Sequence, residues 1–79
     1  MPERLKAGAK LAGSKQTRRA IREGRAQAVF IAQDADPFVT RPVQEMAEAG
    51  GIAVIFVPTM KELGALCGVE VPTACAALL

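Results

Sequence analysis

The sequence predicts an α/β fold of three layers, an α-β-α sandwich around a small mixed sheet of four strands. Three observations lead to this prediction. The chain has 79 residues, enough for one hydrophobic core, so residues 1–79 should form a single domain. Two continuous apolar runs, at 28–32 and 52–57, are typical of strands covered on both faces. Each run precedes a segment with helical character, so strands and helices alternate.

The residues before the first apolar run predict a helix, a strand and a second helix. Residues 1–7 have the character of a short helix, and residues 8–12 form a strand that lacks β-branched side chains. Gly13 and Ser14 interrupt this pattern. Ser14 is a suitable N-cap for a helix from Lys15 to about Glu23, which Gly24 should end as the C′ residue.

A longer helix is expected after strand 28–32. Asp36 supplies an N-cap and Pro37 a first-turn proline, so the helix should run to Ala49 and end at the two following glycines. Pro42 lies inside this segment and cannot donate a main-chain hydrogen bond. The first turn should therefore be separate or kinked.

The last third of the chain predicts a strand, a helix, a loop and a closing strand. Residues 52–57 form the second buried strand. The following helix carries Met60, Leu63 and Leu66 at spacings of three, which predicts one buried face until Gly68 ends the helix. Residues 69–72 form a loop, and residues 74–79 complete the sheet.

Composition excludes several classes of function. The chain has no histidine, which excludes imidazole metal sites and Ser-His or Cys-His catalysis. With no Trp or Tyr and three Phe, it cannot assemble the aromatic platform on which RRM and OB domains stack bases. Cys67 and Cys75 lack CxxC spacing, so we expect buried, unpaired thiols. No nucleophile–base pair is visible, so neither an enzyme nor a cofactor is expected.

Asp34 and Asp36 follow a predicted strand at the end where α/β folds bind ligands. Two carboxylates could hold a divalent cation, but no third ligand is visible, and helix capping is the simpler role. We therefore expect no metal site. The chain also has no apolar run long enough to cross a bilayer and no signal peptide, which predicts a cytoplasmic protein without a membrane partner.

Charge is divided unevenly along the chain. Residues 1–25 hold eight Lys and Arg against two acidic residues, a net charge of +6, whereas residues 26–79 hold two basic and six acidic residues, a net charge of −4. This asymmetry favours a polyanionic partner on one side of the molecule. A solvated basic helix face explains the charge equally well at this point.

The segment from Gly13 to Arg19 places cations at the start of a helix, where the macrodipole is already positive. An anion at this position would resolve the conflict, and free N–H groups with Lys15, Arg18 and Arg19 would form a phosphate-backbone site. Gln16 offers both a donor and an acceptor to base edges. The alternative is an ordinary capped helix.

The loop Gly68-Val69-Glu70-Val71-Pro72-Thr73 is apolar for an exposed connection. Two valines flank a carboxylate and could press on an unstacked base. Alternatively, both valines are part of the core, which is the more common place for such side chains.

Three stretches together resemble the ribosomal protein L7Ae family of kink-turn RNA-binding proteins, and most closely its short bacterial branch. They are Gly13 to Arg19 with Ala20 and Gly24, the run 31–37 (Ile-Ala-Gln-Asp-Ala-Asp-Pro), and residues 63–71 (Leu-Gly-Ala-Leu-Cys-Gly-Val-Glu-Val). Their order and spacing cover nearly the whole chain. The resemblance implies an α-β-α sandwich that grips a kink-turn, an RNA element with tandem sheared G·A pairs and a flipped bulge nucleotide.

The resemblance also implies roles for individual residues. Gly13, Ser14, Lys15 and Gln16 would approach the RNA backbone and guanine edges, with Arg18 beside them, and Arg19 would hold a phosphate or base edge. Val69, Glu70 and Val71 would lie at the bulge. Lys15, Gln16 and Arg19 stand where archaeal members commonly hold Asn, Glu and Lys, whereas bacterial members carry a similar Lys-Gln-Thr pattern.

From these features we expect a monomeric RNA-binding protein that recognises and stabilises kink-turn RNA, with ribosomal RNA or structured messenger leaders as targets and the ribosome as a further partner. The alternative is a protein-interaction or ribosome-assembly module that keeps the fold and docks chiefly on protein.

Overall fold

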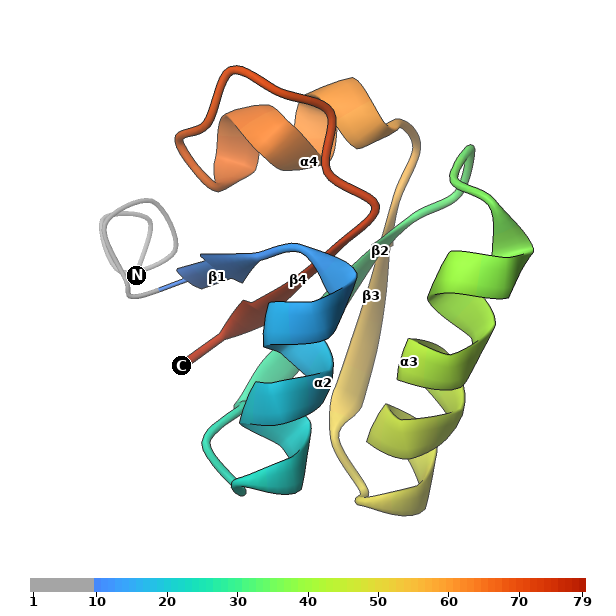
Figure 1. Cartoon of the computed structure of the whole chain (residues 1–79), viewed down its shortest axis with the longest axis vertical. Coiled ribbons are helices and arrows are strands. Elements are labelled where there is room, and N and C mark those ends of the chain that lie inside the picture. Colours follow the sequence, from blue (N-terminus) through green and yellow to red (C-terminus); the bar gives the residue numbers. More distant parts are fainter. Residues whose placement is uncertain (1–9) are drawn as a thin grey trace.

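The computed structural model describes residues 10–79, which form a mixed four-stranded sheet and three helices (Figure 1). The strands lie in the order β1 (Lys10–Ala12), β4 (Cys75–Leu78), β2 (Ala28–Ala32) and β3 (Ala53–Val57). β2 and β3 are parallel, and β4 is antiparallel to both of its neighbours. The predicted helix at residues 1–7 lies outside the described residues, as do the first residues of the predicted strand 8–12.

The helices complete a sandwich of three layers. α2 (Ser14–Arg22) and α3 (Pro37–Ala49) pack side by side on one face of the sheet, and α4 (Met60–Leu66) lies on the other. Alternate residues of β2 supply the two cores: Val29 and Ile31 pack beneath α3, whereas Phe30 and Ala32 face the side of α4. The predicted α-β-α sandwich and the buried strand 28–32 are therefore confirmed.

β3 is an edge strand, and the prediction that both of its faces are covered is wrong. Among the described residues no strand pairs with its outer edge. The side chains of Ile55 and Phe56 remain 44% and 49% exposed, although Val57 at the end of the strand is buried. A continuous apolar run does not reveal whether a strand is central or at an edge, because that depends on strand order, which local sequence does not encode.

The start of α2 also differs from the prediction. The helix begins at Ser14 and its N-cap is Gly13, so Ser14 is not the N-cap, and no side chain of the described residues caps the first turn. Gly13 adopts φ 110° and ψ 146°, a conformation almost restricted to glycine, which turns the chain directly from β1 into the helix. Gly24 follows the C-cap in the left-handed conformation, and the Arg25 N–H donates to the Ala20 carbonyl over 2.9 Å, so the predicted C′ role of Gly24 is confirmed.

α3 is capped as predicted but is not interrupted. The Asp36 side chain accepts a hydrogen bond from the Phe38 N–H over 2.9 Å, and Gly50 and Gly51 end the helix. Pro42 lies within one continuous helix, so a separate first turn is not formed. Pro42 removes only the main-chain bond to the carbonyl of Phe38, which lies in an exposed first turn where water can take its place.

α4 buries a different face from the one predicted. Thr59 caps it by accepting from the Glu62 N–H over 3.1 Å. Leu63 and Gly64 are fully or nearly buried, Met60 and Cys67 are partly buried, and Leu66 is 48% exposed. Residues 60, 63, 64 and 67 share one face of an α-helix, whereas Leu66 at i+6 has rotated away from it. The predicted burial of Leu66 is therefore wrong.

Candidate nucleic-acid interface

The start of α2 and the apolar loop (residues 68–73) lie at the same end of the sheet. The Gly13 N–H donates to the Cys75 carbonyl over 2.8 Å, which ties the turn before α2 to the first residue of β4. The Ala32 N–H donates to the Ala74 carbonyl over 2.9 Å, so the end of β2 reaches the same place. In Figure 1 α4 and the segment after it lie at this end. The two stretches singled out from the sequence therefore lie at the same end of the sheet.

α2 directs its cations away from the sheet. Thr17 and Ala20 are fully buried against the sheet, while Lys15, Gln16 and Arg19 are exposed and Arg18 is half-buried. A hollow of about 270 Å³ follows the outer side of the helix, lined by Lys15, Arg18, Arg19, Arg22 and Glu23. Four cations at helical spacing around one hollow give this surface a strongly positive character.

The first turn of α2 is open to a ligand. Among residues 10–79 no side chain accepts a hydrogen bond from its amide N–H groups. The Thr17 hydroxyl instead donates to the Gly13 carbonyl over 2.7 Å and holds the turn from inside. Uncapped N–H groups beside Lys15 suit an anion such as a phosphate.

Arg19 takes part in an exposed ionic cluster. Its Nε lies 3.3 Å from Oε2 of Glu23, and Nη1 of Arg25 lies 3.1 Å from Oε1 of the same carboxylate. Hydrogen bonds from Arg25 and then from Arg19 lower the pKa of Glu23. The Arg19 side chain remains 69% exposed, so a phosphate can reach it.

The apolar loop presents its valines to solvent. Val69 is 37% exposed and Val71 is 64% exposed, so the interpretation that both fill the core is wrong. Glu70 is exposed between them. A hollow of about 450 Å³ is formed by the loop and the adjoining side of α4, and it is lined mainly by apolar groups with one cation at its side: Lys61, Ala65, Val69, Glu70, Val71 and Pro72. Its chemistry suits a flat apolar group such as a base.

The loop is held in place by α4. Gly64 packs so closely on the Val71 carbonyl that a side chain at Gly64 would collide with it. The Thr73 N–H donates to the Met60 carbonyl over 3.0 Å, and the buried Thr73 hydroxyl donates to the Val71 carbonyl over 3.3 Å. The valines are therefore exposed on a fixed backbone.

Asp34 and Asp36 act as helix caps. Oδ1 of Asp34 accepts from the Met60 N–H at the start of α4 over 2.8 Å, a link across 26 positions of the chain, and Asp36 caps α3. The capping roles are thus confirmed for both. Within residues 10–79 there is no group of three His, Cys, Asp or Glu side chains that could hold a metal ion.

The two cysteines are unpaired and differ in burial. Cys75 is fully buried at the start of β4, as predicted, whereas Cys67 is only half-buried at the end of α4. Burial raises the pKa of the Cys75 thiol to about 11 and also raises the pKa of Cys67. Both thiols are protonated near neutral pH.

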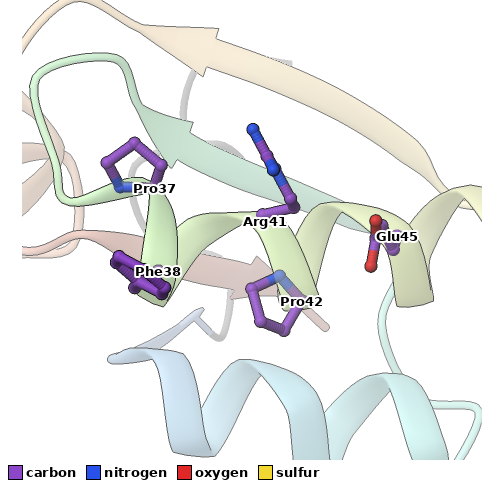
Figure 2. A pocket seen from close by; sticks show the side chains of 5 residues that line it. All are labelled: Pro37, Phe38, Arg41, Pro42 and Glu45. Atoms are coloured by element: carbon purple, nitrogen blue, oxygen red, sulfur yellow. The ribbon is translucent and has the colours of Figure 1, made fainter.

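One exposed side chain was not identified from the sequence. Phe38, in the first turn of α3, is 90% exposed and lies beside a hollow that is also lined by Pro37, Arg41, Pro42 and Glu45 (Figure 2). The buried face of α3 consists of Thr40, Val43 and Ala47. At 100° per residue Phe38 points away from that face, so the helical spacing in the sequence is sufficient to predict that Phe38 is exposed.

Comparison with known proteins places the chain among its relatives. The family model of the ribosomal protein L7Ae/L30e/S12e/Gadd45 family matches residues 1–79. An RNA-binding protein of Geobacillus sp. strain WCH70 is 41% identical over 75 residues, which cover 95% of this chain and 92% of that protein. The large ribosomal subunit protein eL8 of Halobacterium salinarum is 41% identical over 68 residues, which cover 85% of this chain and 57% of that protein.

A solved structure shows the same architecture. The 15.5-kD RNA-binding protein of Giardia lamblia matches with a TM-score of 0.82 and 31% identity, covering 89% of this chain and 59% of that protein. None of the helices within residues 10–79 is long and apolar enough to cross a membrane. The family resemblance noted in the sequence is confirmed: the chain belongs to the ribosomal protein L7Ae/L30e/S12e/Gadd45 family.

Proposed function

We propose that the chain is a non-enzymatic RNA-binding protein that recognises kink-turn RNA and stabilises its bent form. The observation that carries this proposal is the meeting of two complementary surfaces at one end of the sheet, the uncapped cationic start of α2 and the rigid apolar loop. The RNA-binding names of its relatives support the same role.

The two surfaces suit different parts of the RNA. The amide groups of the first turn, with Lys15 and Arg18, attract backbone phosphates and set the position of the RNA. Gln16 is exposed next to them and has the donor and acceptor atoms that base edges require. Its neutral amide should provide discrimination, whereas the cations provide affinity.

The apolar loop suits an unpaired base. Val69 and Val71 are exposed on a backbone that α4 and the Thr73 hydrogen bonds hold in place, so little conformational entropy is lost on binding. A base lying on these valines removes apolar surface from water. Because a straight duplex offers no such base beside its groove, simultaneous contact with both surfaces favours the kinked form.

The cellular target in this proposal is a cytoplasmic structured RNA, either ribosomal RNA or a messenger leader, and the ribosomal relative at 41% identity supports the first. We propose that the protein acts as a monomer, because the interface is built from elements of a single chain.

The test measures the affinity of two proteins, each for two RNAs. Affinities of the wild type and Gln16→Ala are measured for a kink-turn and for a duplex in which Watson-Crick pairs replace the G·A pairs, at about 0.15 M salt, where exposed charges are partly screened. The wild type should prefer the kink-turn, and Gln16→Ala should lose about 1 to 3 kcal/mol on the kink-turn but little on the duplex.

Equal affinity of the wild type for both RNAs would exclude kink-turn recognition and leave cationic attraction or the protein-docking alternative. A uniform loss by Gln16→Ala on both RNAs would make Gln16 a structural residue of the helix start.

A further inference from the structure

Phe38 is the most exposed large apolar side chain in the described part of the molecule, at 90%. Exposing an aromatic ring to water is unfavourable by about 2 kcal/mol relative to burying it, so such a ring often marks a contact surface. The main chain that carries the ring is fixed, because the Phe38 N–H donates to Asp36 over 2.9 Å and the neighbouring Pro37 has a fixed φ.

The surroundings of Phe38 combine apolar and cationic groups. The hollow beside the ring has a volume of about 370 Å³, close to that of a ligand-sized pocket, and two prolines form part of its wall. Arg41 lies one turn after Phe38, and within residues 10–79 it forms no ion pair. Glu45 lies at the far end of the hollow from Phe38 (Figure 2). A negatively charged partner is therefore favoured at the Phe38 end.

The hollow lies on the outer face of α3, the helix that packs beside the cationic α2. α2 and α3 pack side by side, with Ile21 of α2 against the cluster that includes Val43 and Ala47 on the buried face of α3. Phe38 lies on the opposite, outer face of α3. In Figure 2 Pro42 points toward α2, and Phe38 lies one turn earlier on the same helix, at the end where α2 begins. RNA bound at the start of α2 would thus have Phe38 beside it.

We propose that Phe38 stacks on a nucleobase of the bound RNA that lies outside the groove, with Arg41 holding a neighbouring phosphate. This inference rests on the proposed function and extends its interface from α2 onto α3. An exposed aromatic ring next to a cation suits single-stranded nucleic acid, because every base has a face on which a ring can stack and the cation can hold a phosphate. Composition excludes a platform of several aromatic residues, but one exposed phenylalanine is sufficient for one base.

The experiment uses matched leucine variants and one fluorescent variant. Phe38→Leu and Phe56→Leu each replace an exposed phenylalanine by an apolar side chain, and only the first lies beside the cationic helix. The kink-turn used carries single-stranded nucleotides next to its bulge. Phe38→Leu should bind this RNA about tenfold more weakly, whereas Phe56→Leu should bind like the wild type.

Phe38→Trp gives an independent readout. The chain has no Trp or Tyr, so the introduced indole is the only strong fluorophore, and stacking on a base should quench its emission. Phe38→Trp should retain the wild-type affinity and lose most of its fluorescence when RNA saturates it. Thermal midpoints of all three variants should stay within a few degrees of the wild type, because neither ring is fully buried.

The proposal is overturned when Phe38→Leu binds as tightly as the wild type and the tryptophan emission is unchanged in the saturated complex. The face would then be free for a protein partner, and kink-turn recognition by the wild type would stand. If the wild type does not prefer the kink-turn, the proposed function fails instead, and quenching by whichever RNA is bound still decides whether Phe38 stacks.

Discussion

The main chain of α4 at Gly64 lies directly against the carbonyl group of Val71. A helix and a loop can approach so closely only where one partner has no side chain. The contact joins a buried position of α4 to the exposed Val71, and it holds the apolar loop against the helix.

This contact predicts that Gly64→Ala displaces the loop. The added methyl group would collide with main-chain atoms, which cannot move aside without shifting residues 69–72, so the free energy of unfolding should fall by about 1 to 3 kcal/mol. Affinity for kink-turn RNA should fall as well. Gly50→Ala is the control, because a methyl group there meets its nearest atom at 3.5 Å, an ordinary contact. Unchanged RNA binding by a folded Gly64→Ala protein would remove the loop from the interface.

Truncation of Val71 separates binding from stability. The side chain is 64% exposed, so Val71→Ala should change the free energy of unfolding by less than about 0.5 kcal/mol while it weakens kink-turn binding several-fold. Val43→Ala provides the contrast, because Val43 is fully buried and its truncation should cost about 2 kcal/mol of stability. Thermal melts and RNA titrations of both variants check this. A loss of stability without a loss of affinity for Val71→Ala would contradict the role of the loop.

Glu23 should compete with RNA for Arg19 if Arg19 binds the RNA as proposed. The carboxylate lies 3.3 Å from the Arg19 guanidinium and adds negative charge beside the cationic hollow. Glu23→Gln should therefore tighten RNA binding and leave the thermal midpoint almost unchanged, since exposed ion pairs contribute little to stability. Arg19→Ala should weaken binding by about 1 to 3 kcal/mol. Titrations at two salt concentrations test both, and weaker binding by Glu23→Gln would show that the carboxylate instead orients Arg19 for the RNA.

Stability should decline at alkaline pH because of Cys75. In the folded protein burial raises the pKa of this thiol from 9.0 to about 11, whereas in the unfolded chain it should deprotonate near its ordinary value. Between these pH values the unfolded state loses a proton that the folded state keeps, so the free energy of unfolding should fall by on the order of 2 to 3 kcal/mol. Denaturant unfolding under reducing conditions from pH 8 to 11 measures this decline. Cys75→Ala should show a shallower decline, and identical profiles would refute the assignment.

Much of the fold could be predicted because several of its elements are marked by local sequence signals. β2 was recognisable from its apolar run, and α3 from Asp36 and Pro37, since both signals are local. Strand order is not local, which is why the exposure of β3 was missed. Leu66 is exposed because a residue six positions after Met60 lies on a different face of an α-helix.

The candidate site was predicted in part for the same reason. The start of α2 could be found from its unusual cations, but Val71 could not be assigned from the sequence, because its exposure depends on the contact with Gly64. The number of aromatic residues does not reveal the exposure of Phe38, which depends on the helix face on which it lies.

The most direct test of the account measures the bend of the RNA itself. A kink-turn RNA labelled with a donor and an acceptor fluorophore at its two ends is titrated with the protein at low divalent-ion concentration, where the free RNA is extended. The account predicts that energy transfer rises with protein concentration and reaches a plateau. The Watson-Crick control RNA should show no rise. Binding of both RNAs without any change in energy transfer would show that the protein does not stabilise a kinked conformation.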